Sequence, residues 1–430
     1  MSKNPVSSKD FEKALEVGRP PNIKTLFPNS KALIVSGKVI DRAMMAKGKA
    51  ISIAANGRNQ FVIRGALLAA QKANSALIIE IAKSEGGAKA YCAVNFWNMA
   101  MLVDAVCNEL KITVPVAIHA DHYGIKSDKD IAAAKVEIPT MFEAGITSIA
   151  IDASNLPDDK NLLASITLNP FIPKWAGYET EVGEIKGDAG LSTVEEAVFL
   201  IQGLNAYDIF PDWIALNNGT THGIEEKDSG IQVQLTADIH KALEKYRVSG
   251  AQHGTSGNSS ERLRQIVAKT RTTKANVATA LQMISWGVQV NDYGNAILDS
   301  SGNFNKVKEE GMTEEMWAEM AAYAQSKGWK KGDYKNLNLP FENKLLSLPK
   351  KIRERMVKGG EDFVYKMMTE VFNSEDTAPL ALETILKAGS FDLGPKMTRI
   401  ESPEDWTESK ITERASRLGH DKGPAGKFDD

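Results

Sequence analysis

Between residues 50 and 300, short apolar runs alternate with amphipathic helical patterns along the chain. The runs cover residues 50–56, 76–82, 114–121, 147–152, 178–185, 213–219, 249–253 and 286–292. Strands separated by helical stretches are typical of βα units that pair into a parallel sheet. Eight strands within about 250 residues match the size of a (β/α)₈ barrel. We therefore predict an α/β protein built on a TIM (β/α)₈ barrel.

A doubly wound parallel sheet is the alternative that shares this alternation. Its nucleotide-binding versions carry G-x-G-x-x-G after the first strand, and the run 50–56 is not followed by that pattern. A Walker-type G-x-x-x-x-G-K-[ST] is also missing from the chain. The barrel is therefore the preferred architecture.

The pattern divides the chain into three parts. Residues 1–45 are interpreted as an N-terminal extension and residues 46–300 as the catalytic barrel. The strand signal ends after residue 300, so residues 301–430 are predicted to form a helical C-terminal extension with a polar tail. This helical region offers a surface for subunit contacts, and we expect a homo-oligomer.

Charge and hydropathy restrict the partners. A net charge of -3 gives no reason to expect nucleic acid, which usually needs a basic face. The chain has no run of about 18 apolar residues that would span a membrane. Its first residues lack the apolar core of a signal peptide, so we expect a cytoplasmic protein. Cys92 and Cys107 are interpreted as reduced, because a disulfide scaffold would be denser in cysteine.

Three of the six histidines follow apolar runs directly: His122, His222 and His253. In a parallel barrel these strand ends form the catalytic face. A single histidine is more often a hydrogen-bonded polar residue than a ligand, but three at strand ends are typical of a shared site. Three imidazoles with an open fourth position suit a catalytic zinc ion.

The other three histidines are less suited to be metal ligands. His240 lies in a helical pattern and His420 in the tail, so both are expected to be solvated. His119 lies on the strand that leads to the site and either supports the site or is buried.

Several loops together resemble one known family. HADH (119–122), NNGTTHG (217–223), QHGTSG (252–257) and the VND of 290–292 resemble successive motifs of the class II, zinc-dependent fructose-bisphosphate aldolases. Upstream, AANGRNQ (54–60) and SEGGAKAY (84–91) are similar to the first two strand-end loops of that family, and YETEVGEIKGDAG (178–190) to its glutamate strand and flexible loop. The resemblance covers residues 50–300 in the family's order, which also implies a TIM barrel.

The resemblance implies a catalytic centre. His122, His222 and His253 bind one catalytic divalent ion, Zn²⁺. Asp121 is the acid/base on the substrate hydroxyl. Metal-ligand carboxylates are implied at two further positions, with a possible second cation: Glu181 and Asp152.

The resemblance also implies substrate contacts for a phosphorylated sugar. Gly254 and Ser256 precede a helical pattern, where backbone N–H groups can bind a phosphate. A plain strand-to-helix turn is the other interpretation of this segment. The full set of implied substrate contacts is Asn56, Ser84, Gly223, Gly254, Ser256 and Asn291.

Adjacent residues of a strand point to opposite sides, so Asp121 and His122 reach one site only if the strand already bends there. Gly124 favours such a bend. The alternative role for Asp121 is a cap of the helix near Ser127.

Some positions depart from the family pattern. Glu226 stands where a lysine is usual, and the usual Asn-x-Asp-Thr reads Asn291-Asp292-Tyr293-Gly294. The flexible loop lacks a clear match for the family's proton-handling glutamate. Asp188 and Glu184 are the nearest carboxylates, and Asp188 is the candidate we take for that role. These differences concern the substrate more than the metal.

The predicted activity is reversible aldol cleavage of fructose 1,6-bisphosphate to dihydroxyacetone phosphate and glyceraldehyde 3-phosphate. A divalent metal acting as a Lewis acid stabilises the charge that develops on the carbonyl oxygen. The alternatives are another ketose phosphate (tagatose bisphosphate or a sulfonated sugar phosphate), a Schiff-base aldolase using Lys83, and a metal-binding barrel without catalysis.

Overall fold

The computed structural model describes residues 8–88, 90–183, 190–219 and 230–418. Eight parallel strands close into a barrel in the order β1-β2-β3-β4-β5-β6-β7-β8. The strands are β1 (Ser52–Asn56), β2 (Leu77–Ala82), β3 (Val116–Gly124), β4 (Ser148–Asp152), β5 (Gly177–Val182), β6 (Trp213–Leu216), β7 (Ser249–Gln252) and β8 (Thr272–Val277). The predicted TIM barrel is confirmed.

The first seven predicted strands coincide with β1–β7, and the eighth prediction is wrong. β8 pairs with both β7 and β1 and closes the barrel. Residues 286–292 lie beyond it, where Val288 and Val290 form isolated antiparallel bridges with Lys306 and Ala296. β8 does not form an apolar run, because four of its six residues, Thr272, Thr273, Lys274 and Asn276, are polar.

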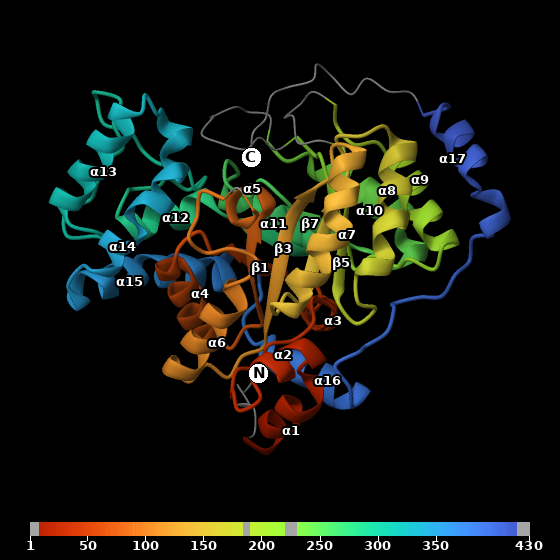
Figure 1. Ribbon diagram of the computed structural model, residues 1–430, viewed down its shortest axis with the longest axis horizontal. Helices are drawn as coiled ribbons and strands as arrows, with labels where there is room; N and C mark the ends of the chain where they lie inside the picture. The colour runs from red at the N-terminus through yellow and green to blue at the C-terminus, as the bar shows by residue number, and fades with distance from the viewer. Residues whose placement is uncertain (1–7, 89, 184–189, 220–229, 419–430) are drawn as a thin grey trace.

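Helices surround the barrel, and each strand is buried on both faces as parallel strands usually are. Figure 1 shows α4, α6 and α7 packed outside β1, β3 and β5. The barrel helices are α4 (Gln60–Ala73), α5 (Lys83–Gly86), α6 (Met99–Leu110), α7 (Asp128–Glu143), α8 (Asp158–Leu168), α9 (Val194–Ala206), α10 (Val233–Ala242), α11 (Ser260–Lys269) and α12 (Thr279–Trp286), with the 3₁₀ turns η1 (Asn169–Phe171) and η2 (Glu244–Tyr246).

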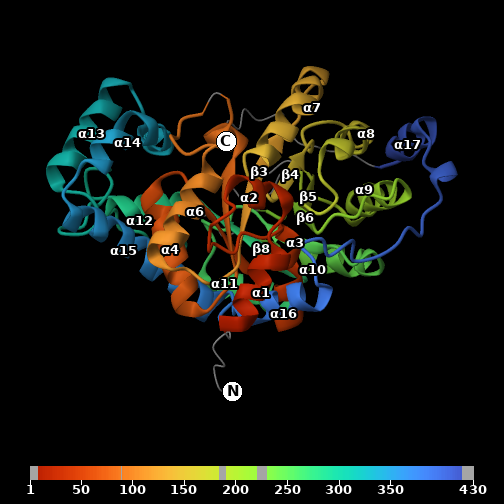
Figure 2. The same cartoon turned by 60° about the horizontal axis from the view of Figure 1, so that its bottom comes forward.

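The amino-terminal end of the barrel is closed by an apolar plug. The helices α1 (Ser8–Gly18), α2 (Pro21–Leu26) and α3 (Gly37–Lys47) precede β1. Val39 and Met44 of α3 share a hydrophobic cluster with Ala54, Ile78 and Trp213 from inside the barrel. Figure 2 shows α1, α3 and α16 at this end. The interior is therefore filled from below, and a ligand can approach only from the carboxyl ends of the strands.

The chain after α12 covers the outside of the barrel. A separate hydrophobic cluster holds α13 and α14, α15 packs along α4, and α17 contacts α8 and α9. Figures 1 and 2 both place α13 and α14 on one flank and α17 on the opposite flank. These elements are α13 (Glu314–Ser326), η3 (Lys331–Leu337), α14 (Asn338–Leu346), α15 (Lys350–Lys366), the π-helical η4 (Met367–Val371), α16 (Ala378–Ala388), η5 (Pro403–Asp405) and α17 (Glu408–Ala415). Among the described helices, none has the length and apolar character needed to cross a membrane.

Candidate active site

The end of β3 brings two neighbouring residues, Asp121 and His122, into one site. Between Ala120 and Tyr123 the pairing with β4 shifts, and β3 carries an extra residue there. His122 has a φ of 42°, in the left-handed region that non-glycine residues rarely adopt. A β-bulge of this kind re-aims side chains next to functional sites. The predicted bend exists, and it falls at His122 rather than at Gly124.

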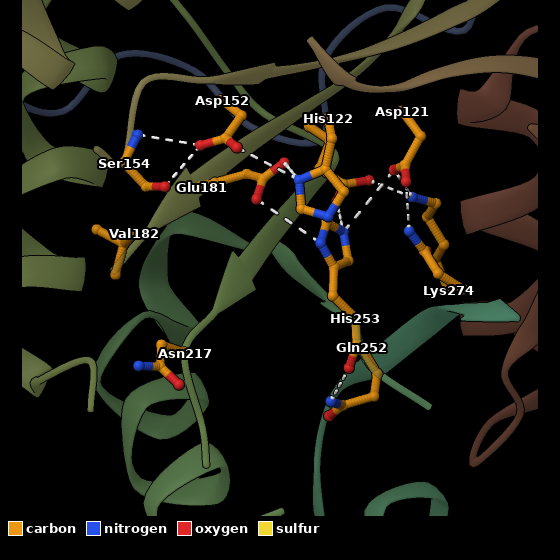
Figure 3. A network of polar contacts seen from close by, with 12 residues as sticks. Asp121, His122, Asp152, Ser154, Glu181, Val182, Asn217, Gln252, His253 and Lys274 are labelled. Atoms are coloured by element: carbon orange, nitrogen blue, oxygen red, sulfur yellow. Dashed lines mark hydrogen bonds and ion pairs between the residues drawn. The ribbon is translucent and has the colours of Figure 1, made fainter. Parts of the chain in front are cut away.

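Two imidazoles and a carboxylate form the centre of the site. The groups of His122, His253 and Glu181 each offer a ligand atom within 4.8 Å of the others. Nδ1 of His122 lies 3.1 Å from Oε1 of Glu181, and Nδ1 of His253 lies 3.6 Å from Oε2 of the same carboxylate. The two rings meet edge to face with centroids 4.2 Å apart (Figure 3).

This donor set fits a divalent metal ion. His253 is 1% exposed, and its Nδ1 has no hydrogen-bond partner among the residues that the structure describes. A buried polar atom without a partner is unfavourable unless a ligand satisfies it. Imidazole nitrogens with carboxylate oxygens are the ligands of catalytic zinc and related transition metals.

Asp152 supports His122 from β4. Its Oδ2 lies 3.3 Å from Nδ1 of His122, and its Oδ1 accepts hydrogen bonds from the backbone N–H and hydroxyl of Ser154. Burial would raise the Asp152 pKa, but the hydrogen bond from His122 and the donors of Ser154 outweigh it and lower the pKa to about 2. Asp152 is therefore a fixed anion that orients an imidazole.

Electrostatics at the site favour a bound cation. Burial and the charge of Asp152 raise the pKa of Glu181 to about 7. Burial disfavours charge on His122, yet the carboxylates of Glu181 and Asp121 raise its pKa well above the usual range. Both shifts favour protonated Glu181 and His122 at a point where several carboxylates converge. A bound divalent ion would supply the positive charge in place of these protons.

The carboxylate of Asp121 is held by two donors from β8. Lys274 Nζ lies 3.2 Å from Oδ1, and Asn276 Nδ2 donates to Oδ2 at 2.9 Å. Lys274 and Asn276 are two residues apart, so β8 presents both to the same side. Burial would raise the Asp121 pKa, but the charges of Lys274 and His122 hold it well below its ordinary value. Asp121 does not cap a helix, because Ser127 caps α7.

Beneath Asp121 lies a polar layer inside the barrel. Lys274 also contacts Oε2 of Glu179 at 2.8 Å, Oε2 of Glu80 at 3.3 Å and Nε2 of His119 at 3.2 Å. Oε1 of Glu179 lies 2.7 Å from Nε2 of His253, so this layer reaches a predicted metal ligand. Burial and the carboxylate of Asp121 raise the pKa of Glu80 well above the ordinary value. Of the two roles left open for His119, burial is confirmed, and its ring also contacts the network around Asp121.

A second network fixes Asn56 at the end of β1. Asn56 Nδ2 donates to Oε2 of Glu85 at 2.5 Å, and Arg58 Nε donates to Oε1 at 2.6 Å. Glu85 also accepts from the backbone N–H of Ala82 and the hydroxyl of Tyr91. A carboxylate only accepts, so the amide nitrogen of Asn56 must face it. Oδ1 of Asn56 is buried without a partner among the described residues and is left to accept.

The loops after β2 and β7 carry other predicted contacts. Ser84 lies in α5, and its buried Oγ has no hydrogen-bond partner within the described part of the chain. Gly254 has a φ of 59° and, with Ser256, lies between β7 and α11. A carboxylate already contacts the N-terminal end of α11, because Asp292 accepts hydrogen bonds from the backbone N–H and the hydroxyl of Ser260.

Three predicted residues, His222, Gly223 and Asp188, lie outside the described residues. Asn291 does not end a barrel strand as expected. Its Oδ1 accepts from the backbone N–H groups of Tyr293 and Asn295, which shapes its own loop.

Asn276 and Lys274 contact the site but were not among the residues predicted for it. Residues 276–279 read Asn-Val-Ala-Thr, so the usual Asn-x-Asp-Thr is met here with alanine in place of aspartate. That pattern, in a segment with β-branched Thr272 and Thr273, was the signal that could have located β8.

Two other residues differ from expectation. His240 is 2% exposed rather than solvated, and its Nδ1 accepts from the backbone N–H of Arg271 at 3.1 Å. Lys83 Nζ donates to the carbonyl of Gly124 and lies 4.0 Å from the ring centroid of Tyr123, whose hydroxyl donates to Glu137 of α7. Lys83 therefore lies on the helix side of β3 and not inside the barrel, which disfavours the Schiff-base alternative.

Known proteins share this architecture. The chain aligns with the YdjI aldolase from Escherichia coli K12 with a TM-score of 0.54 and 16% identity, covering 80% of this chain and 99% of that one. The Campylobacter jejuni fructose-bisphosphate aldolase gives a TM-score of 0.51 and 19% identity, covering 80% of this chain and 97% of the other. At these identities the likeness concerns the fold.

Sequence relatives extend the comparison. The chain is 27% identical over 222 residues to the sulfofructosephosphate aldolase of Alkalicoccus urumqiensis, covering 49% of this chain and 70% of the relative. It is 29% identical over 233 residues to the fructose-bisphosphate aldolase of Ureaplasma parvum, covering 54% and 74%. Residues 38–328 match the family described as Fructose-bisphosphate aldolase class-II. That match spans more than half of the chain, and the chain therefore belongs to the class-II fructose-bisphosphate aldolase family.

Proposed function

We propose that the protein catalyses metal-dependent, reversible aldol cleavage of a phosphorylated ketose, with fructose 1,6-bisphosphate as the first candidate. The products are dihydroxyacetone phosphate and glyceraldehyde 3-phosphate. The observation that supports this best is the group of His122, His253 and Glu181 directly beside the buried carboxylate of Asp121, which is held by two donors from β8. A metal-binding barrel without catalysis has no need of a carboxylate fixed in this way.

The metal ligands are His122 and His253, with His222 proposed as the third from its sequence position. When bound, a divalent ion, Zn²⁺ first, supplies Lewis-acid stabilisation of the negative charge on the substrate carbonyl oxygen. Glu181 and Asp152 are the carboxylates available for a second cation position. Asp152 also orients His122, as carboxylates behind metal-ligating histidines commonly do.

Asp121 handles the hydroxyl proton. In the cleavage direction the hydroxyl proton passes to the Asp121 carboxylate while the O–H electron pair forms the aldehyde carbonyl. The electron pair of the broken carbon–carbon bond goes to the carbon next to the ketone. General base catalysis of this kind contributes roughly 10²- to 10⁴-fold. Asp188 is proposed for the carbon-bound proton.

The substrate contacts follow from the buried polar groups at the barrel mouth. Asn56 presents an acceptor and so suits a substrate hydroxyl. Gly254 and Ser256, with Gly223, are proposed to bind a phosphate. Asn276, near the end of β8, is proposed in place of Asn291 as the substrate contact near the reacting carbonyl. Ser84, which lies just after β2, is proposed as a further substrate contact.

A second substrate keeps the mechanism and changes the sugar. One of the sequence relatives is named a sulfofructosephosphate aldolase, so a sulfonated ketose phosphate is the second candidate. Tagatose bisphosphate is the third. Initial rates on the three ketoses at equal concentration separate them, and a tenfold or greater preference assigns the substrate.

One variant tests catalysis against mere metal binding. Asp121→Ala should keep one equivalent of metal and lose turnover on every ketose in the panel. Wild-type protein that binds metal but cleaves none of these phosphates would contradict the proposal. We also propose that the enzyme is a homo-oligomer, which light scattering measures directly.

A further inference from the structure

An ammonium group occupies the centre of the barrel, beneath the proposed acid/base. The Lys274 side chain is fully buried, and three carboxylates surround it, from Glu80, Asp121 and Glu179. Figure 3 shows Lys274 reaching toward Asp121 from the side opposite Glu181. A buried lysine is expensive in free energy unless it is paired, so this arrangement needs an explanation.

We propose that Lys274 is a positioning residue that holds the Asp121 carboxylate correctly turned for proton transfer, which rests on the function proposed above. Lys274 contacts one carboxylate oxygen of Asp121 and Asn276 contacts the other. With both oxygens held from β8, the carboxylate cannot rotate about its bond to Cβ. Each oxygen keeps a further lone pair for a substrate hydroxyl.

The contacts of Lys274 indicate more than neutralisation of buried negative charge. Glu80, Asp121 and Glu179 come from β2, β3 and β5, and the ammonium lies within 3.3 Å of all three. Glu179 in turn lies 2.7 Å from the ring of His253. Through Glu179, the Lys274 ammonium therefore connects the proposed acid/base with His253, a proposed metal ligand. Loss of the Lys274 ammonium should therefore change the orientation of the Asp121 carboxylate before it changes the metal ligands.

The chain contains a matched control at the other end of the barrel. Lys396 is also buried, and its Nζ contacts Asp41 Oδ2 at 2.8 Å, the carbonyl of Asp212 at 2.7 Å and Ser249 Oγ at 3.1 Å. These partners lie at the amino-terminal end of the strands, away from Asp121. Lys396→Met removes a buried ammonium of the same kind and reports the purely structural effect.

The test compares two partial reactions of metal-loaded protein. Cleavage of the ketose bisphosphate needs the hydroxyl proton that Asp121 accepts. Exchange of the carbon-bound proton of dihydroxyacetone phosphate with deuterated solvent does not need that proton. The variants are Glu179→Gln and the pair Lys274→Met with Glu179→Gln, which removes one charge of each sign. Changes in folding and metal content affect both rates. The ratio of cleavage to exchange therefore reports the effect of Lys274 on the hydroxyl-proton step.

Relative to Glu179→Gln, the double variant should lose about 100-fold in cleavage, the lower end of a general-base contribution, and keep exchange within about threefold. KM for the ketose should change little. Lys396→Met should lower the melting temperature and leave the ratio as in the wild type. Should the methionine variant not fold, Lys274→Gln replaces it, with an amide N–H as the remaining donor and a smaller fall in the ratio.

Equal losses in cleavage and exchange, or an unchanged ratio in folded, metal-loaded protein, would overturn the role of Lys274. The failure of the proposed function looks different. In that case the wild type itself shows neither cleavage nor exchange when loaded with metal.

Discussion

The imidazoles of His122 and His253 meet edge to face, with ring centroids 4.2 Å apart, although they come from strand ends four strands apart around the barrel. Both rings face the carboxylate of Glu181. Two imidazoles at this distance repel each other when both are protonated, and they share a divalent ion easily. The pair is therefore the part of the site that should respond most to loss of metal.

Replacing His253 should remove the metal. His253→Ala deletes a proposed ligand that is 1% exposed and in contact with Glu179. We expect metal affinity to fall by 100-fold or more and cleavage to fall with it. Metal content after dialysis against a weak chelator measures the effect. His240→Gln, a change at a buried histidine on α10, should retain full metal content. Full metal retention by His253→Ala would contradict the assignment.

Removing Glu85 should destabilise the fold. Glu85→Ala leaves the buried guanidinium of Arg58 without its carboxylate partner. Breaking a buried pair in this way costs about 3–5 kcal/mol. Urea denaturation measures the free energy of unfolding. The control is Glu109→Ala, which breaks the exposed pair with Arg64 and should change stability by less than about 1 kcal/mol. Equal effects of the two variants would show that Arg58 finds another partner.

His240 should make stability depend on pH. Burial and the nearby charge of Arg271 lower its pKa to about 4 from a model-peptide value of 6.5. The folded state therefore holds a neutral imidazole, while the unfolded chain takes up a proton below pH 6.5. The stabilising contribution is complete above pH 6.5 and is lost as the pH falls toward 4. Between pH 7 and pH 5 this amounts to about 2 kcal/mol.

The measurement compares free energies of unfolding for the wild type and His240→Gln at both pH values. Glutamine can still accept from the backbone N–H of Arg271 and does not titrate. The wild type should lose about 2 kcal/mol more than the variant on acidification. Parallel losses would mean that His240 takes up its proton in the folded state as readily as in the unfolded chain.

Asn56 should act on substrate binding more than on turnover. Its amide is oriented by Glu85, so that Oδ1 is left for a substrate hydroxyl. Asn56→Ala should raise KM about tenfold, which corresponds to one hydrogen bond of roughly 1.4 kcal/mol. Initial rates over a range of ketose concentrations separate KM from kcat. A variant with normal KM and reduced kcat would place Asn56 at the reacting centre instead.

Much of the fold could be predicted from the sequence, because seven strands carry apolar runs of ordinary length. β8 was missed, because it carries no apolar run: Lys274 and Asn276 are interior residues whose charge and polarity are balanced by side chains from distant strands. The shared site of Asp121 and His122 depends on a bulge in β3, which the alternation of residues does not reveal. His240 was expected on a solvated face because sequence gives no sign that its helix position faces Gly250 of β7.

The most direct measurement is a coupled cleavage assay on fructose 1,6-bisphosphate before chelation, after chelation and after one equivalent of Zn²⁺ is restored. We expect activity that disappears on chelation and returns with the metal, with one tightly bound divalent ion per chain in the purified protein. The sulfonated ketose phosphate is assayed in parallel. Cleavage of either sugar that persists unchanged in metal-free protein would contradict a metal-dependent aldolase.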